Sequence, residues 1–326
     1  MKDTPVRFAF ALGMGLAAAF PALAAETKSV AISTIVETPA LSETREGVIE
    51  GLKENGFVEG ENLTVDYQNA NANMPTQQQI AQKFVGNAPD VIVAITTPTA
   101  QAMLSATSEI PIVFASVTDP VQAKLIAQYE QPGGNITGIS DAAPVGRQVA
   151  LMREIVPELK TIGYVYNPGL DNAVVTLKWL NEQTEPLGIK VIASPAPTPN
   201  EVIPATRKLV GKVEAIYVPN DSTVVASLEA VIKVGQDTRT PIFAGETGAV
   251  HRGVVGSVGL DYISVGKVAG QMAADILNGA KPGEIDAVIA YNLLDHFKVV
   301  LNRGAAKRMG AEIPESVIST ATEVID

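Results

Sequence analysis

One strand–turn–helix pattern occurs twice in this sequence and constrains the fold more than any other feature. The apolar run 91–95 follows Lys83-Phe84-Val85-Gly86 and ends at the polar turn 96–99. Residues 214–217 follow 208–211 in the same way and end at the turn 219–223. A short apolar run bounded by turn residues is typical of a buried parallel strand. The pattern therefore predicts two copies of one strand–helix unit.

Two further pairs of segments repeat in the same order. Residues 28–32 resemble 160–164, and residues 110–115 resemble 240–244. Three ordered matches at a nearly constant offset indicate two similar lobes, because a solenoid would have a much shorter period. Strands that alternate with helices favour parallel sheets. We expect an α/β fold of two doubly wound parallel-sheet lobes joined by a hinge, with lobe 1 at 28–141 plus 260–285 and lobe 2 at 142–259 plus 286–326.

The apolar runs and turn signals also predict the individual elements. Thr97 is expected to cap a helix whose first residue is Pro98. We expect strands at 30–35, 63–67, 91–95, 112–114, 136–139, 162–166, 190–193, 215–218, 242–244, 254–258 and 287–290. We expect helices at 41–55, 77–85, 100–107, 121–129, 145–156, 173–187, 202–210, 224–238, 265–278 and 299–309.

Residues 1–24 have the layout of a secretory signal peptide. Lys2 and Arg7 precede the apolar stretch 8–20, and Ala22-Leu23-Ala24 forms a cleavage site. The stretch is shorter than the ~20 residues that a membrane span needs. Because the chain has no cysteine, it offers no residue for lipid attachment after cleavage. We therefore expect a protein that is free in the periplasm.

Composition argues against several classes of partner. Without residues 1–24 the chain keeps 22 basic and 34 acidic residues, a net charge of −12. An acidic surface disfavours nucleic acid and anionic membranes as partners. With two histidines and no cysteine, a structural zinc site is close to excluded. No phosphate-binding or dinucleotide fingerprint occurs after residue 24, so we expect neither a metal nor a cofactor.

Signals for catalysis are weak. Residues 138–142 approach a nucleophile elbow but lack its final glycine, and Ser264-Val265-Gly266-Lys267 has no companion motif. Asp119 and Asp221 could act as acid and base in a hydrolase or isomerase, which is the second hypothesis. Because no complete catalytic constellation is present, we expect the protein not to be an enzyme.

Polar residues gather where the predicted strands end, and ligands of open parallel sheets bind there. Any one of these residues could simply cap its own helix, but their recurrence in both lobes predicts a binding cleft. Hydroxyls and a helix N-terminus, at Thr97 and Thr99, suit a carboxylate, and Asp119 or Asp221 suits an ammonium. The predicted ligand is a small zwitterion. The candidate ligand-binding residues are Glu37, Thr97, Thr99, Ser116, Asp119, Ser140, Asn172, Asp221 and Glu246.

Several long motifs resemble one family, the TrpX-type substrate-binding proteins of ABC transporters. They are residues 37–41, 56–62, 95–101, 117–121, 135–141, 218–223, 259–262 and 301–306. Residues 142–145 and 169–172 depart from the family's pattern. The resemblance covers nearly all of the chain after residue 24.

The resemblance implies a type I periplasmic-binding-protein fold and uptake of a small molecule. Characterised members of the family suggest an aromatic amino acid, such as tryptophan or tyrosine, as the ligand. The implied partner is an ABC permease in the inner membrane, and we expect a monomer. A sensor that reports the ligand to a membrane receptor is a third hypothesis, because one fold serves both uses.

Overall fold

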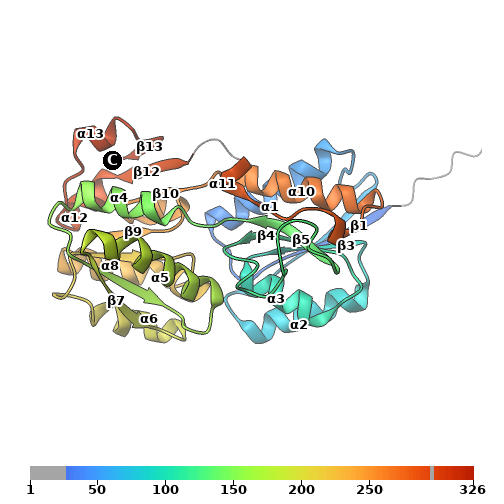
Figure 1. The fold of residues 1–326 in the computed structure, drawn as a ribbon, viewed down its shortest axis with the longest axis horizontal. Helices are drawn as coiled ribbons and strands as arrows, with labels where there is room; N and C mark the ends of the chain where they lie inside the picture. The colour runs from blue at the N-terminus through green and yellow to red at the C-terminus, as the bar shows by residue number, and fades with distance from the viewer. Residues whose placement is uncertain (1–26, 294–296) are drawn as a thin grey trace, which may run out of the picture.

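The computed structural model describes residues 27–293 and 297–326, which form two α/β lobes side by side (Figure 1). Lobe 1, on the right, combines the N-terminal third of the chain with helix α10 (Tyr262–Leu277). Lobe 2, on the left, holds the middle of the chain and the C-terminus. The predicted signal peptide lies outside the described residues. Among the described residues, no helix is both long and apolar enough to cross a membrane.

Lobe 1 is built on a parallel sheet with the strand order β11-β5-β4-β3-β1-β2. Residues of β3 alternate between two cores. Val91 and Val93 belong to the core shared with α1 and α10, whereas Ile92 and Ala94 belong to the core shared with α2 and α3. Burial on both faces explains the uninterrupted apolar run. The elements are β1 (Lys28–Thr34), α1 (Pro39–Glu54), β2 (Leu63–Asn69), α2 (Met74–Asn87), β3 (Val91–Ile95), α3 (Thr97–Ala106), β4 (Ile112–Val117), β5 (Ile136–Ser140) and β11 (Val288–Ile289).

Lobe 2 is built on a sheet with the strand order β13-β12-β10-β9-β8-β6-β7. Neighbouring strands are parallel except for β12 and β10, which are antiparallel, so β12 and β13 run opposite to the other five strands. The strands are β6 (Thr161–Tyr166), β7 (Lys190–Pro195), β8 (Ala215–Val218), β9 (Ile242–Ala244), β10 (Gly256–Gly259), β12 (Lys298–Asn302) and β13 (Glu323–Ile325). The helices are α4 (Val145–Ile155), α5 (Asp171–Thr184), α6 (Pro199–Arg207), α7 (Ser222–Val225), α8 (Leu228–Thr238), α9 (Gly248–Arg252), α12 (Arg303–Arg308) and α13 (Glu315–Ile318).

The two sheets confirm the internal repeat. Five strands of lobe 1 lie in the order β2-β1-β3-β4-β5, and five strands of lobe 2 lie in the equivalent order β7-β6-β8-β9-β10. In each lobe the strand order reverses beside the first strand, between β1 and β3 and between β6 and β8. Crevices at the C-terminal ends of strands near such a reversal are the usual ligand sites of this fold class.

The chain crosses between the lobes after β5, after β10 and after α11 (Ala290–Leu293). The sequence placed the last boundary between residues 285 and 286. In the structure Val288 and Ile289 pair with Ile139 and Ser140 of β5, so this segment is part of the lobe 1 sheet. The last crossing therefore lies after β11, a few residues later than expected.

Three predicted helices differ from the structure. Residues 121–129 form turns, and Lys124 takes a positive φ of 58° that no α-helix contains. The predicted helix 299–309 begins as β12, because its β-branched residues pair with β10, and α12 starts only at Arg303. The predicted helix 224–238 is two helices, α7 and α8, separated by Ala226 and Ser227.

The backbones of helices α1 and α10 are in direct contact. This packing attaches α10, which follows the second crossing, to lobe 1. A Cβ on Gly47 would lie 2.2 Å from the Ile263 carbonyl oxygen, and one on Gly266 would lie 2.1 Å from the Thr44 carbonyl oxygen. Only glycine permits this approach. The close packing fixes the start of α10, and with it Tyr262, against lobe 1.

Candidate functional site

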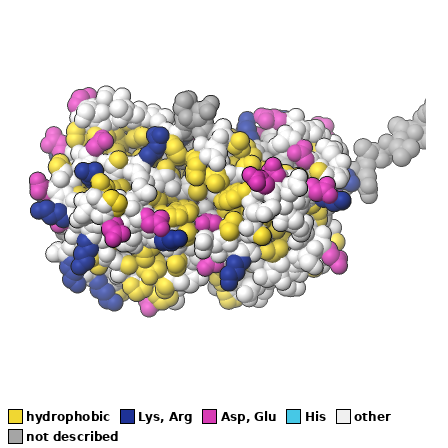
Figure 2. Space-filling model, viewed as in Figure 1, with side chains coloured by type: hydrophobic (Ala, Val, Ile, Leu, Met, Phe, Trp, Pro, Cys, Tyr) yellow, Lys and Arg dark blue, Asp and Glu magenta, His cyan; other side chains and the backbone are white. Residues whose placement is uncertain are grey.

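A cavity lies between the lobes where the C-terminal ends of the two sets of strands face each other. The space between its lining residues is about 460 Å³ when the part open to solvent is included. Figure 2 shows side chains of the two lobes in contact along the seam between them on this face. The lining residues are Val36, Thr38, Leu41, Thr96, Thr97, Pro98, Ser116, Thr118, Asp141, Asn172, Asn220, Asp221, Ser222, Val225, Glu246 and Tyr262.

The N-terminus of α3 forms part of the lobe 1 wall. The sequence predicted Thr97 as the cap and Pro98 as the first helical residue, but Thr96 occupies the cap position and Thr97 begins the helix. The Thr96 hydroxyl is hydrogen-bonded to the Thr99 hydroxyl at 3.0 Å and does not cap the backbone. The Thr97 hydroxyl oxygen is buried without a partner. Because first-turn N–H groups lack intrahelical partners, this wall favours negative charge.

Two residues of the lobe 1 wall have strained backbones. Thr96 has φ 87° and Ser116 has φ 51°, values that residues other than glycine rarely adopt. The Ser116 hydroxyl is hydrogen-bonded to the Thr44 hydroxyl of α1 at 3.0 Å. Such strain persists only where surrounding contacts hold it, and it clusters at ligand sites.

Asp221 of lobe 2 lines the cavity but is occupied by the backbone. Its Oδ1 accepts hydrogen bonds from the N–H groups of Thr223 (2.8 Å) and Val224 (3.2 Å) at the start of α7. Its Oδ2 accepts one from the Asn167 N–H at 2.5 Å. Burial raises the pKa of Asp221 to about 6, although these bonds oppose the rise. Both oxygens thus tie the strand ends of lobe 2 together.

Glu246 follows β9 and reaches the cavity from lobe 2. Its Oε2 accepts a long hydrogen bond, 3.5 Å, from the Thr38 hydroxyl of lobe 1. Its Oε1 is buried without a partner. Burial raises the pKa of Glu246 to about 7, and the guanidinium of Arg252 only partly opposes this. The side chain is therefore a buried carboxyl with one free oxygen.

Asp141 stands at the first crossing between the lobes. Its Oδ2 accepts hydrogen bonds from the Tyr262 hydroxyl (3.2 Å) and the Asn220 amide (3.5 Å). Its Oδ1 is buried without a partner. Burial raises the pKa of Asp141 to about 6. Asp141 and Glu246 thus each present one unpaired oxygen within the same cavity lining.

Two amides add further acceptors. The Asn172 Nδ2 donates to the Asn220 carbonyl oxygen at 2.6 Å, and the Asn220 Nδ2 donates to Asp141. These partners accept hydrogen bonds, which fixes the orientation of both amides and identifies both Oδ1 atoms as acceptors. Both Oδ1 atoms are buried without a partner. No lining residue in the described part of the chain is Lys, Arg or His, so the cavity suits a ligand rich in N–H donors.

The structure brings some of the predicted site residues together and places others elsewhere. Thr97, Ser116, Asn172, Asp221 and Glu246 line the cavity. Glu37, Thr99, Asp119 and Ser140 do not, and each has local partners in lobe 1.

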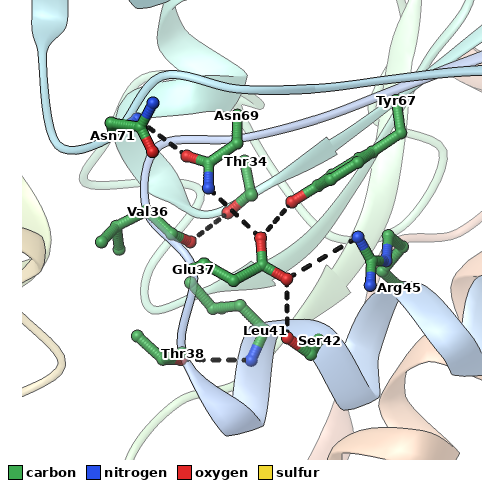
Figure 3. A network of polar contacts seen from close by, with 10 residues as sticks. All are labelled: Thr34, Val36, Glu37, Thr38, Leu41, Ser42, Arg45, Tyr67, Asn69 and Asn71. Atoms are coloured by element: carbon green, nitrogen blue, oxygen red, sulfur yellow. Dashed lines mark hydrogen bonds and ion pairs between the residues drawn. The ribbon is translucent and has the colours of Figure 1, made fainter.

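Glu37 lies in a polar network on the lobe 1 side (Figure 3). Its carboxylate accepts hydrogen bonds from Tyr67, from Ser42 at 2.8 Å and from Asn69 at 3.2 Å. Arg45 lies 3.6 Å from the same carboxylate and stacks over the Tyr67 ring. The network holds the β1–α1 connection in place, and Thr38, the next residue, reaches the cavity instead.

The other three side chains satisfy nearby groups. The Thr99 hydroxyl donates a hydrogen bond to the Gln77 side-chain oxygen at 3.4 Å. Asp119 accepts hydrogen bonds from the N–H groups of Val121 (3.1 Å) and Gln122 (3.0 Å). The Ser140 hydroxyl donates to the Thr118 carbonyl oxygen at 3.0 Å. Asp119 and Asp221 are consequently not assembled as an acid–base pair.

The candidates chosen from the sequence do not include Asp141, Asn220 and Tyr262, which line the cavity. Asp141 and Asn220 follow predicted strands, so strand-end position could have found them. Tyr262 follows the second crossing and reaches the cavity only through the packing of α10 on α1. Tyr262 belongs to the motif 259–262, but nothing in that motif assigns its side chain to the cavity.

Other candidate chemistry is not assembled in the described residues. No group of three His, Cys, Asp or Glu side chains there is placed to hold a metal ion. In the Ser264–Lys267 motif, the lysine ammonium pairs with Glu50 at 3.0 Å and Glu54 at 2.9 Å on the surface. That lysine supports helix packing and lies outside the cavity lining.

Comparison with known proteins gives a consistent result. Residues 29–325 match the model of a family described as ABC transporter substrate binding protein. A tyrosine-binding protein of Clostridioides difficile is 37% identical over 282 residues, which cover 86% of this chain and 81% of that protein. A solved Vibrio cholerae structure, described as a conserved domain protein, is 44% identical with a TM-score of 0.88, covering 92% of this chain and 100% of that one.

Two further solved structures match this chain to different extents. An ABC domain from Streptococcus pneumonia in complex with L-Trp is 31% identical and gives a TM-score of 0.87, covering 92% of this chain and 100% of that one. The ligand-free, open structure of a substrate-binding protein from Clostridium difficile is 37% identical but gives a TM-score of only 0.68. This match covers 92% of this chain and 99% of that one. This chain therefore superposes better on the complex with L-Trp than on the open structure, although the open protein has the more similar sequence.

Proposed function

The chain belongs to the ABC transporter substrate-binding protein family, and from this we propose that it binds an aromatic amino acid as a zwitterion between its lobes. The observation that carries the proposal is the interlobe cavity, whose lining combines a free hydroxyl with free carboxyl oxygens. Lobe 1 offers the free Thr97 hydroxyl and the N-terminus of α3, which suit a carboxylate. Asp141 and Glu246 offer free carboxyl oxygens, which suit an ammonium.

The apolar part of the lining suits the side chain of such a ligand. Val36, Leu41 and Pro98 from lobe 1 face the cavity together with Val225 and Tyr262. An apolar surface with a few convergent polar groups is the usual composition of small-ligand sites. The relatives described as tyrosine-binding and as a complex with L-Trp support tyrosine and tryptophan as the first ligands to test.

Within this proposal the protein is a periplasmic receptor that delivers its ligand to an ABC permease in the inner membrane and acts as a monomer. The family supports the transporter role. Residues 1–24 support export, because they have the layout of a signal peptide. The ligand leaves unchanged, since the two aspartates of the hydrolase hypothesis do not meet in the cavity.

Calorimetric titration of the purified mature chain with L-tyrosine and L-tryptophan tests the proposal. We expect saturable one-to-one binding of at least one of them and a higher melting temperature. Ligand at ~100 times its dissociation constant adds roughly 2.7 kcal/mol to the free energy of unfolding. L-Alanine, which has the same zwitterionic head, serves as the control for the aromatic side chain. Binding of neither aromatic amino acid would exclude the proposal.

A further inference from the structure

We propose that Asp141 and Glu246 together hold the amino group of the ligand, and that this group, more than the carboxylate, decides which ligands close the lobes. The inference rests on the proposed function and adds the basis of its selectivity. It reassigns the ammonium contact, which the sequence had given to Asp119 or Asp221.

Asp141 and Glu246 each have a carboxyl oxygen that no protein group binds, whereas the oxygens of Asp221 are occupied. The two carboxylate oxygens of Asp221 accept hydrogen bonds from three backbone N–H groups, and Asp119 is not among the residues that line the cavity. Asp141 Oδ1 and Glu246 Oε1 are buried in the cavity wall without a donor. A buried acceptor without a donor is costly, so a ligand group is expected to supply one. An ammonium brings three donors, enough for both carboxyls and for one of the free Asn172 or Asn220 carbonyl oxygens.

The second step is that the two carboxyls belong to opposite sides of the cleft. Asp141 follows β5 of lobe 1, and Glu246 follows β9 of lobe 2. Closing the lobes without a ligand buries both, and the charge of Asp141 further disfavours ionisation of Glu246. An ammonium between them removes this penalty because each charge then has a partner. The amino group therefore stabilises the closed arrangement selectively.

The third step is the weaker hold on the carboxylate. No lining residue of the described chain carries a positive side chain. A ligand carboxylate has only neutral donors, such as Thr97, and the N-terminus of α3. Helix-end interactions are weaker than a pair of charge-assisted hydrogen bonds in a buried site. Removing the carboxylate should therefore cost less affinity than removing the amine.

Two tyrosine analogues test this on the wild-type mature chain. Tyramine lacks the carboxylate, and 3-(4-hydroxyphenyl)propionate lacks the amine. By calorimetry at pH 7.5 we expect tyramine to bind within about 30-fold of L-tyrosine, and the propionate to bind at least about 300-fold more weakly. In small-angle scattering, the chain with tyramine should have a smaller radius of gyration than the ligand-free chain, and the same should hold with L-tyrosine. A propionate that binds more tightly than tyramine would overturn the inference.

Variants assign the contact to the two residues. Asp141→Asn and Glu246→Gln keep size and should each weaken L-tyrosine binding by at least about 30-fold. Glu158→Gln, an exposed acid far from the cavity lining, is the control. Circular dichroism melts establish that the variants fold. If both variants bind L-tyrosine within threefold of wild type, the inference is wrong while the proposed function stands. If the wild type binds neither L-tyrosine nor L-tryptophan, the proposed function itself has failed.

Discussion

The two walls of the cavity share one backbone plan and differ in chemistry. The lobe 1 wall carries hydroxyls at Thr38, Thr97 and Ser116, and the lobe 2 wall carries Asn220 and Glu246 among its amides and carboxyls. The strand order behind both walls is equivalent. A duplicated fold thus supplies two similar surfaces whose residues differ: hydroxyls line the lobe 1 wall, Asn220 and Glu246 line the lobe 2 wall, and Asp141 adds a carboxyl from the first crossing.

A second contrast lies among the acids themselves. Asp221 is bound to backbone N–H groups within lobe 2, whereas Asp141 and Glu246 keep one oxygen free. Buried carboxyls that follow strands therefore differ: one is held in the scaffold, and two keep an oxygen free for a ligand. The predictions below test that division, from the largest effect to the smallest.

Removing the scaffold acid should cost the most stability. Asp221→Ala leaves three N–H groups without acceptors in the buried end of lobe 2. At about 1 kcal/mol or more each, the free energy of unfolding should fall by at least about 3 kcal/mol in urea denaturation. Asp119→Ala in lobe 1, which frees two N–H groups at a partly exposed turn, is the comparison. Equal losses in the two variants would contradict the scaffold role.

The ligand-facing acids should make lobe closure depend on pH. Burial between the lobes raises the pKa of Glu246 from 4.5 to about 7, with Arg252 opposing the rise and Asp141 and Glu43 adding to it. The closed form therefore binds more protons than a form with Glu246 in water. Closure without ligand is then favoured below pH 4.5 and loses up to about 3 kcal/mol as pH rises to 7.

Small-angle scattering of the ligand-free chain measures this effect. The radius of gyration should increase between pH 5 and pH 8. Glu246→Gln, which does not titrate, should be more compact than wild type at pH 8 and nearly equal to it at pH 5. Identical pH profiles for the two proteins would remove Glu246 from the closure step.

Each hydroxyl of the lobe 1 wall should contribute less to ligand affinity than the two ligand-facing acids. Thr97→Val removes a buried hydroxyl that has no partner within the protein. If this hydroxyl donates to the ligand carboxylate, L-tyrosine binding should weaken about fivefold to tenfold, close to the net worth of one hydrogen bond. Tyramine binding should stay within about twofold in the same calorimetric titrations. Thr64→Val, an exposed threonine of β2, is the control, and equal effects on both ligands would argue against the carboxylate contact.

The rim of the cleft should contribute least. The Gln101 amide of lobe 1 donates to Asp171 of lobe 2 at 2.7 Å at an exposed position. Exposed contacts of this kind contribute less than about 1 kcal/mol, so Gln101→Ala should weaken L-tyrosine binding by no more than about fivefold. Gln271→Ala, whose hydrogen bond to Asp275 stays within α10, should change nothing. A loss equal to that of Glu246→Gln would place the main closure contact at the rim.

Much of the fold could be predicted because its signals are local. The continuous apolar run 91–95 reads as a doubly buried strand, and the ordered repeats predict two lobes with the same strand order. The errors arose where tertiary contacts decided the outcome. Residues 299–302 pair with β10 and so extend as a strand, and β11 pairs with β5 and so stays with lobe 1.

The sequence by itself determined the lobes, the strand ends and the acidic, hydroxyl-rich character of the site, because these depend on local pattern and composition. Only the tertiary structure decided which acids are free. Whether Asp119, Asp141, Asp221 or Glu246 keeps an oxygen available depends on backbone N–H groups distant in the chain, such as that of Asn167 on Asp221. Hydrogen-bond partners across 54 residues leave no trace in a local motif, so the ligand contacts become visible only after the chain has folded.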